Sequence, residues 1–357
     1  MNNKKYRYMV CTRCTTYNHA PYIVDAMNGF TCQETTFPVV YVIVDDASTD
    51  GEARVIREYL EENFTEQSVR DEEYANIISA RHNRNINCFF VALLLKYNHG
   101  SIKKSKNGYL KEWYDEAKYN ALCEGDDYWT SPNKLQKQVE FLESHDDYSL
   151  VCNKTILFSQ KNNCFSLANQ SYESSKEMLI EDVILRGGGF ISTCSVMYKS
   201  SVRDSYPDYC LSCHVGDYPL QLMCAMKGKL YYMNDAMSVY RVDIPNSWTN
   251  RSLALDVTKK WKGVFSENSM LIGFLKDYPQ YAGLFKKKIS SNIIRNMPGS
   301  RADFKAFIMF FNEQWFYISE NKIFRKIWLK YSFARLAQRI YMIFHGNQQK
   351  PIYKENK

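Results

Sequence analysis

The sequence predicts an α/β protein in which a mostly parallel sheet is flanked by helices. Residues 38–44, PVVYVIV, are β-branched almost throughout, which is typical of a parallel strand covered on both faces. Strand-like runs alternate with segments of helical period around it, as crossover connections require. The composition, with 45% hydrophobic and 24% charged residues, is that of a globular protein and excludes disordered, collagenous and low-complexity classes.

The first part of the chain alternates between the two kinds of element. Residues 8–15 form an extended run, and Asn18 and Pro21 favour the start of a helix directly after it. Residues 52–63 have helical spacing, and residues 75–80 are a candidate strand. This order favours a sheet whose strands are joined by helices.

The next segment is less regular. Residues 88–95 contain one Ala and three Leu and favour a buried helix, although the period alone leaves a strand open. Residues 97–118 are polar and lysine-rich, and we expect an inserted surface loop there. Residues 119–123 form a candidate strand, and a helix follows Pro132.

The character of the chain changes near residue 250. Before this point the alternating pattern continues, and beyond it the sequence is helical, aromatic and basic. We predict a first domain of residues 1–250, a helical basic-aromatic region of residues 251–345 and a polar tail of residues 346–357.

Residues 321–345 combine six Lys or Arg with Trp, Tyr, Phe and Ile, and contain no acidic residue. A basic amphipathic stretch of this kind favours contact with an anionic membrane surface. The alternative is that its apolar stripe packs on the rest of the protein while its cations are solvated. No apolar run approaches the roughly 18 residues that cross a bilayer, so any attachment would be peripheral.

Charge and cysteine usage limit the partners and the compartment. The net charge of +7 is mild and dispersed, which does not favour nucleic acid as a partner. The eleven cysteines are odd in number and irregularly spaced, and the first residues lack the apolar core of a signal peptide. We expect reduced thiols and a cytoplasmic protein, peripheral on the inner face of the cell membrane where residues 321–345 attach it.

Two acidic pairs follow predicted strands. Asp45 and Asp46 end one of them, and Asp126 and Asp127 lie just after another. Loops at the carboxyl ends of strands in an open α/β sheet converge on a ligand. Adjacent carboxylates repel each other, and gathering them becomes favourable when a cation such as Mg²⁺ or Mn²⁺ binds. The alternative is that each pair caps the following helix.

Three motifs follow one another along the chain: CTTYNHAPYI at residues 14–23, VIVDDASTDG at residues 42–51 and ALCEGDDYW at residues 121–129. Together they resemble the inverting glycosyltransferases of family 2, in the branch that builds bacterial surface polysaccharides. The likeness extends from about residue 8 to residue 248. It implies the GT-A fold, a Rossmann-like α/β domain, and transfer of a sugar from a nucleotide-sugar donor.

The resemblance also assigns expected roles to individual residues. Tyr17 would stack on the nucleotide base, Thr15 would line it, and Asp46 would accept a hydrogen bond from the uracil N–H. Asp126 would contact the ribose or the metal. Asp127 would bind Mn²⁺ or Mg²⁺ beside the diphosphate.

Other positions match less closely. Arg81 and Asn83 match a segment that approaches the nucleotide in relatives. Glu124 stands where many relatives have the first Asp of the D-x-D motif, which leaves its contact with the metal open. Arg13 falls within a strand that should be buried; either it reaches into the nucleotide cleft, or the strand lies less deeply than the pattern suggests.

Asp217, in the sequence Gly216-Asp217, matches the Asp that acts as general base on the acceptor hydroxyl. Direct displacement needs such a base on the face opposite the departing diphosphate; the alternative is an Asp that caps a helix. Arg241 matches a position where it pairs with phosphate oxygens or forms a structural salt bridge. Asp243 replaces a histidine of relatives, and is either a metal ligand or a lost contact.

We therefore expect a hexosyl- or N-acetylhexosaminyltransferase that uses a UDP-sugar and Mn²⁺ or Mg²⁺, with inversion. Its acceptor would be a glycan or a lipid-linked saccharide, in the synthesis of a bacterial surface glycan. A sugar nucleotidyltransferase and a noncatalytic glycan-binding or scaffold protein are the alternatives. For residues 97–118 a solvated loop is favoured over a cover for the acceptor site.

Overall fold

The structure, a computed structural model, describes residues 5–102, 104–168, 172–245, 247 and 257–296. The chain divides into two compact units, residues 1–253 and 254–357. Residues 321–345, predicted to contact a membrane, and the predicted polar tail of residues 346–357 lie outside the described residues.

The strands of the first unit belong to one mixed sheet. They are β1 (Tyr8–Thr16), β2 (Val39–Asp45), β3 (Phe64–Asp71), β4 (Ala75–His82), β5 (Cys88–Leu95), β6 (Ala117–Leu122), β7 (Tyr128–Trp129), β8 (Tyr148–Ser159), β9 (Cys164–Leu167), β10 (Lys176–Glu177), β11 (Met197–Lys199) and β12 (Lys229–Val242). Within the described residues the strand order is β10-β12-β8-β11-β6-β1-β2-β5-β4-β3, with β7 paired to β12 and β9 to β8.

Helices flank this sheet. They are α1 (Ile23–Thr31), α2 (Glu52–Asn63), α3 (Lys111–Tyr114), α4 (Lys134–Ser144), α5 (Ile180–Arg186), α6 (Asp208–Leu211) and α7 (Asp217–Lys227). Short 3-10 turns add η1 (Asn107–Leu110), η2 (Gly188–Phe190), η3 (Thr193–Ser195) and η4 (Ser200–Ser205). The α/β class with a sheet flanked by helices is confirmed.

The central strands β6, β1, β2 and β5 run parallel to one another. Every residue of β2 is buried, as its β-branched sequence predicts for a strand covered on both faces. Thr16 pairs with Asp45, so β1 and β2 end at the same edge. This edge carries the loops that contain the predicted site residues Tyr17 and Asp46.

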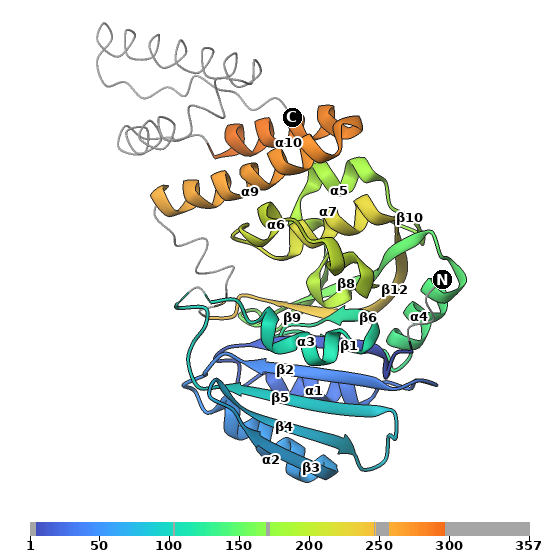
Figure 1. Cartoon of the computed structure of the whole chain (residues 1–357), viewed down its shortest axis with the longest axis vertical. Helices are drawn as coiled ribbons and strands as arrows, with labels where there is room; N and C mark the ends of the chain where they lie inside the picture. Colours follow the sequence, from blue (N-terminus) through green and yellow to red (C-terminus); the bar gives the residue numbers. More distant parts are fainter. Residues whose placement is uncertain (1–4, 103, 169–171, 246, 248–256, 297–357) are drawn as a thin grey trace, which may run out of the picture. The chain divides into compact units, whose positions relative to one another are not determined.

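Two apolar cores lie on opposite faces of the sheet. On one face α1 packs on β2, where Phe30 stacks on Tyr41 with ring centroids 5.1 Å apart. On the other face, Trp113 of α3 joins the cluster that contains Val42 and Val44. Figure 1 shows α1 and α2 behind the blue strands and α3 in front of them. Both faces are thereby shielded from water.

Residues 88–95 are strand β5, so the predicted helix is wrong. The segment pairs parallel to β2 and antiparallel to β4, with Val42 opposite Val91. All but one of its residues are buried, because helices or loops cover both faces of the sheet here. A strand buried on both faces loses the alternation that distinguishes it from a buried helix, which is why its sequence period misleads.

In the second unit the described residues form a helical hairpin. It consists of α9 (Val257–Asp277), η5 (Pro279–Tyr281) and α10 (Ala282–Arg295). Phe274 and Phe285 stack with ring centroids 5.8 Å apart, and Asn292 Nδ2 donates a hydrogen bond to Asn268 Oδ1 at 3.1 Å. Among the described helices, none is both long enough and apolar enough to span a membrane.

Candidate functional site

The loops after β1 and β2 are held together by side chains of the first two motifs. Asn18 Oδ1 accepts a hydrogen bond from the Thr49 N–H at 2.8 Å, and Asp50 Oδ2 accepts one from the Ala20 N–H at 2.9 Å. Asn18 has a positive φ of 57°, which Asn tolerates better than most residues. The polar residues of these motifs thus fix the shape of the sheet edge.

Glu52, at the start of α2, contacts both the loop after β1 and the loop after β2. Its carboxylate is buried and accepts hydrogen bonds from the His19 N–H at 2.9 Å, the Ser48 hydroxyl at 2.8 Å and the Thr16 hydroxyl. Burial raises the pKa of this carboxyl group despite these donors. Sequence reasoning missed Glu52, because a Glu in the first turn of a helix is common on electrostatic grounds alone.

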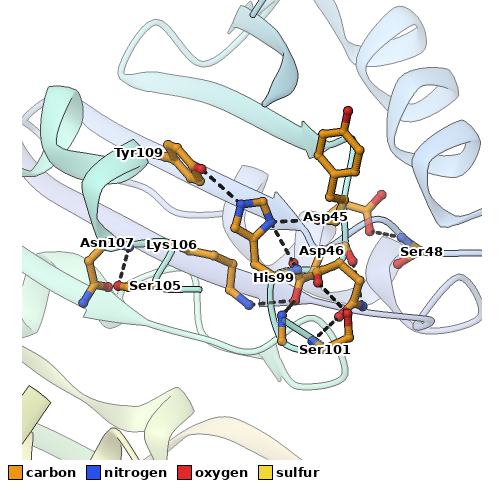
Figure 2. Close-up of polar contacts among 12 residues, drawn as sticks. Asp45, Asp46, Ser48, His99, Ser101, Ser105, Lys106, Asn107 and Tyr109 are labelled. Atoms are coloured by element: carbon orange, nitrogen blue, oxygen red, sulfur yellow. Dashed lines mark hydrogen bonds and ion pairs between the residues drawn. The ribbon is translucent and has the colours of Figure 1, made fainter. Parts of the chain in front are cut away.

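The carboxylate of Asp46 accepts hydrogen bonds from the segment that follows β5. Its Oδ1 accepts the His99 N–H at 2.7 Å, and its Oδ2 accepts the Gly100 N–H at 3.0 Å and the Lys106 ammonium at 2.8 Å. Figure 2 shows the Lys106 side chain extended toward this carboxylate, with the His99 ring between it and Tyr109. The predicted contact from Asp46 to a uracil N–H would compete with these three donors.

The composition of residues 97–118 leads us to expect a solvated loop. The structure instead ties the segment around His99 and Lys106 to Asp46. His99 is 1% exposed, its Nδ1 lies 2.7 Å from the Tyr97 carbonyl oxygen, and its Nε2 lies 3.1 Å from the Tyr109 hydroxyl. Burial alone would raise the pKa of Asp46, but the donors from Lys106, His99 and Gly100 outweigh it and lower that pKa. Asp46 is thus an ionised anchor for this loop.

The acidic loop after β6 lies directly against β1. Gly125 donates its N–H to the Thr15 carbonyl at 3.0 Å, and a Cβ at this position would lie 2.1 Å from Thr16 Oγ1. Only glycine fits between Glu124 and Asp126, because any side chain would clash with Thr16. This close approach brings the acidic loop to the ends of β1 and β2.

The two adjacent carboxylates of this loop face different surroundings. Asp126 retains partial exposure, and its Oδ2 lies 3.7 Å from His19 Nε2. Asp127 is fully buried, and its Oδ1 accepts the Arg241 N–H at 2.9 Å. Burial and the neighbouring Asp126 raise the pKa of Asp127 well above its usual range.

The metal contact of Asp127 stays a prediction: within the described part of the chain, its Oδ2 is buried and has no hydrogen-bond partner. Its Oδ1 holds the backbone of β12, and neither oxygen is open to solvent in this structure. Asp126, beside His19 at the sheet edge, is the carboxylate of this pair that a ligand can reach.

The pKa of Glu124 is affected by charged residues from several parts of the chain. Burial raises its pKa to about 7; the charges of Asp126 and Asp217 also raise it, while those of Arg13 and Lys106 lower it. These groups come from four separate parts of the chain. The structure therefore brings Glu124, Asp126 and Asp217 into one electrostatic environment.

Asp217 begins α7, and its Oδ1 accepts the N–H of its neighbour Tyr218 at 2.8 Å. Its Oδ2 lies against the triple-glycine turn, where a Cβ on Gly188 would come within 2.8 Å of it. The Oδ1 contact is with the adjacent residue only, and the start of α7 has no side-chain cap hydrogen bond, so the alternative of a helix-capping Asp is not what the structure contains. The other oxygen is positioned by the close approach of Gly188.

Arg241 is tied into the protein rather than exposed to a ligand. Its NH1 donates to the Asp126 carbonyl at 2.8 Å, its NH2 pairs with Asp25, and its guanidinium lies 4.7 Å from the centre of the Tyr128 ring. The side chain is 6% exposed. Of the two alternatives for Arg241, the structure contains the salt bridge, and the predicted phosphate contact lacks accessible donors.

Asp243 lies at the end of β12, with φ of 61°, and its Oδ2 accepts the Ser159 hydroxyl at 2.6 Å. It is exposed. Among the described residues, no group of three or more His, Cys, Asp or Glu side chains is placed to hold a metal ion. The predicted ligand set of Asp126, Asp127 and Asp243 is thus not assembled here.

A smaller donor set still fits a divalent cation. Mg²⁺ is often held by one or two carboxylates together with substrate phosphates. Asp126 supplies one accessible carboxylate, and Glu124, two residues before it, supplies a second carboxyl group whose pKa is raised mainly by burial. Asp126, with Glu124 beside it, is therefore the donor set that this chain offers.

Arg81 and Asn83 lie at the opposite end of the sheet from Asp45, and the structure does not bring them to the other predicted site residues. β4 runs antiparallel to β5, which places Arg81 beside Phe89 and Asn76 beside Leu94. Asp45, at the site edge, pairs with Leu94, five residues further along β5 than Phe89. At about 3.3 Å per residue, Arg81 is some 17 Å from that edge.

A cavity of about 450 Å³ opens at the sheet edge where β1 and β2 end. It is lined by Arg13, Thr15, Val44, Lys104, Ser105, Lys106, Asn107, Leu110, Leu211, His214 and Gly216. Thr15 thus lines a cavity, and Tyr17 is half-buried two residues further along the chain; their contacts with a nucleotide base stay predictions. Arg13 and the 104–110 segment were not predicted to line it together; their contribution depends on how the loop folds back over β1.

Known proteins resemble this chain in sequence and in fold. No known protein-family profile matches it. An uncharacterized protein of Mycobacterium tuberculosis, Rv1520, is 30% identical over 247 residues, which is 69% of this chain and 62% of that protein. The chain therefore spans less than two thirds of the length of this relative.

Glycosyltransferases are among the solved structures that resemble it. Staphylococcus aureus TarS has a TM-score of 0.52 at 15% identity, covering 82% of this chain and 44% of TarS. Its 1–349 fragment in complex with UDP-GlcNAc gives a TM-score of 0.46 at 13% identity, covering 74% and 66%. A mannosyltransferase of Pyrobaculum calidifontis, in complex with GDP-Man and Mn²⁺, gives 0.45 at 12% identity, covering 96% and 89%. At 15% identity the likeness to TarS shows the fold alone, a mixed α/β fold with a mostly parallel central sheet.

Proposed function

We propose that this chain transfers a sugar from a nucleotide-sugar donor to a hydroxyl group, with Asp217 as general base. The observation that carries the proposal is the shared environment of Glu124, Asp126 and Asp217 at the edge where β1, β2 and β6 end. The shared fold with TarS, a protein crystallised with UDP-GlcNAc, supports a nucleotide sugar as donor, and the motifs favour a UDP-sugar.

In this mechanism the nucleotide lies over Thr15 and Tyr17 at the end of β1. Asp126 and Glu124 would hold a Mn²⁺ or Mg²⁺ ion, which would neutralise the charge that develops on the departing diphosphate. Asp217 Oδ2 accepts the proton of the acceptor hydroxyl as its oxygen bonds to the anomeric carbon. Attack from the face opposite the diphosphate inverts that carbon.

The acceptor and the location of the enzyme extend this proposal. We infer a glycan or lipid-linked saccharide acceptor in surface-glycan synthesis, and a hexosyl or N-acetylhexosaminyl group as the sugar, from the resemblance of the motifs. We further infer a cytoplasmic enzyme held at the membrane through residues 321–345. Flotation with anionic liposomes, with and without residues 321–357, tests the attachment: equal flotation of both forms contradicts it.

The activity is tested by incubating the protein with Mn²⁺ and a panel of nucleotide sugars. We expect slow release of nucleoside diphosphate from one donor, which a Asp217→Asn variant loses by roughly 100-fold while it still binds the nucleotide. The matched control is Asp208→Asn, at the start of α6, which should retain the activity. Pyrophosphate as the product would indicate a nucleotidyltransferase, and no product from any donor would favour a noncatalytic protein.

A further inference from the structure

The cavity beside Asp217 is lined by basic side chains. Its lining includes Arg13, Lys104, Lys106 and His214, and no acidic residue. Its volume of about 450 Å³ suits a small ligand or one part of a larger one. Like charges gathered around a cavity repel each other, and an anion that binds among them relieves this repulsion.

Arg13 is the most informative of these cations. It lies on β1 in the middle of the sheet, between Val42 of β2 and Leu122 of β6. Its neighbours Thr12 and Cys14 are fully buried, so the strand itself is deep. An arginine in such a strand is costly to desolvate unless an anion pairs with it.

The described residues do not supply that anion at contact distance. Among them, no hydrogen bond or ion pair is formed by the Arg13 guanidinium, although Glu124 lies close enough to influence its pKa. In the same described part, the buried hydroxyl of Tyr114, another neighbour of Arg13, also has no hydrogen-bond partner. Lys106 differs, because its ammonium is already paired with Asp46.

The position of the cavity indicates which substrate it serves. Gly216 lines it and directly precedes Asp217, the proposed base that faces the acceptor hydroxyl. Leu211 and His214, from the loop between α6 and α7, line the same side. Of the residues assigned to the donor, Thr15 borders the cavity at one edge, whereas the accessible carboxylate Asp126, where a cation and the donor diphosphate would bind, is not among the lining residues.

We propose that this cavity binds a phosphate or carboxylate group carried by the acceptor, with Arg13 and Lys104 as its principal contacts. This inference rests on the proposed transferase function, since it places the anion beside the base. The planar guanidinium of Arg13 suits two parallel hydrogen bonds to either kind of anion, and the exposed Lys104 adds a charge at the cavity entrance.

The test is calorimetric titration of inorganic phosphate into the full chain, alone and saturated with UDP. We expect saturable binding that UDP leaves unchanged. Arg13→Met should weaken it by about tenfold or more, because one charge-assisted contact is lost. Lys104→Met, on an exposed side chain whose loss does not threaten folding, should weaken it by roughly threefold or more.

The matched control is Arg54→Met, an exposed cation on α2 that should bind phosphate like the unaltered protein. Binding that both Arg13→Met and Lys104→Met leave unchanged overturns the proposal, as does the absence of phosphate binding. Displacement of phosphate by UDP also overturns it, because it assigns the cavity to the donor diphosphate. Failure of the transferase function itself appears separately, as no nucleotide binding and no diphosphate release, and leaves the phosphate titration readable.

Discussion

The Lys106 ammonium lies 2.8 Å from Oδ2 of Asp46, with side chains 23% and 6% exposed. This pair joins the loop after β5 to the end of β2. Because Asp46 also accepts two backbone N–H groups from that loop, its carboxylate acts as the centre of the loop's structure. Ordering the loop over the sheet edge is what places Lys104 to Asn107 along the cavity.

Replacing Lys106 by Met should destabilise the protein by roughly 1–3 kcal/mol, because a largely buried carboxylate loses its charged partner. The donors to Asp46 lower its pKa, so the stability they contribute is present above the usual Asp pKa and is lost as pH falls through the folded value. Urea unfolding at several pH values between 7 and 3 should show the difference from the unaltered protein shrinking toward acid. Lys111→Met, which removes an exposed pair with Asp115, serves as control and should change stability little.

Gly188→Ala should lower the rate of transfer, with some loss of stability because its Cβ would also lie 3.1 Å from Cβ of the buried Tyr218. Its Cβ would lie 2.8 Å from Asp217 Oδ2, so the carboxylate must move away from its present position. A displacement of about 1 Å can reduce catalysis by roughly 100-fold. Steady-state kinetics and a thermal melt of the same sample separate the two effects.

Gly189→Ala is the matched control, since nothing in the described structure lies within 4 Å of a Cβ there. Equal rates for the two variants would contradict a role for the Gly188 contact in positioning Asp217.

Glu124→Gln should stabilise the protein at alkaline pH when no metal is present. Burial raises the pKa of Glu124 to about 7, so between its usual value and 7 the folded protein holds a proton that the unfolded chain releases. The stability from this proton is complete at acid pH and is lost as pH rises through about 7. The variant should therefore gain stability relative to the unaltered protein at pH 8, and the gain should fade at pH 4 or below.

Unfolding by urea in the presence of a chelator measures this difference. Glu61→Gln, on the exposed face of α2, is the control. A constant difference across this pH range would show that Glu124 titrates normally.

Arg241→Met tests the two roles considered for this residue. The structure predicts a loss of roughly 1.5–3 kcal/mol in the free energy of unfolding, because the links to Asp25 and to the Asp126 carbonyl disappear. Asp25→Asn should cause a smaller loss in the same assay, since that carboxylate is half exposed. If Arg241→Met instead retains full stability and weakens UDP binding, the guanidinium contacts phosphate.

Much of the fold can be read from local sequence. Seven consecutive buried residues in β2 follow from its β-branched run, and α2 follows from its helical spacing. The motifs also correctly indicated that acidic residues gather where parallel strands end. Such features depend on a few neighbouring residues, so their signals survive in a single sequence.

The site is less predictable in its details. Asp126 and Asp127 are adjacent and chemically identical, and Asp127 turns inward to accept the backbone N–H of Arg241, 114 residues further along. Charge composition alone suggested that residues 97–118 are solvated, because nothing local reveals that Lys106 meets Asp46. The helix predicted for β5 failed for a related reason, since pairing with β2 and β4 overrides its weak periodicity.

The sequence by itself determined the α/β class, the order of the acidic motifs and the candidacy of Asp217, because these depend on residue type and spacing. Tertiary structure decided which of these residues meet. Arg81 is separated from Asp46 because β4 reverses direction, whereas Arg13 and Lys104 line one cavity because a loop folds back over β1. Strand direction and loop closure are set by contacts between distant segments, and no local pattern of residues encodes them.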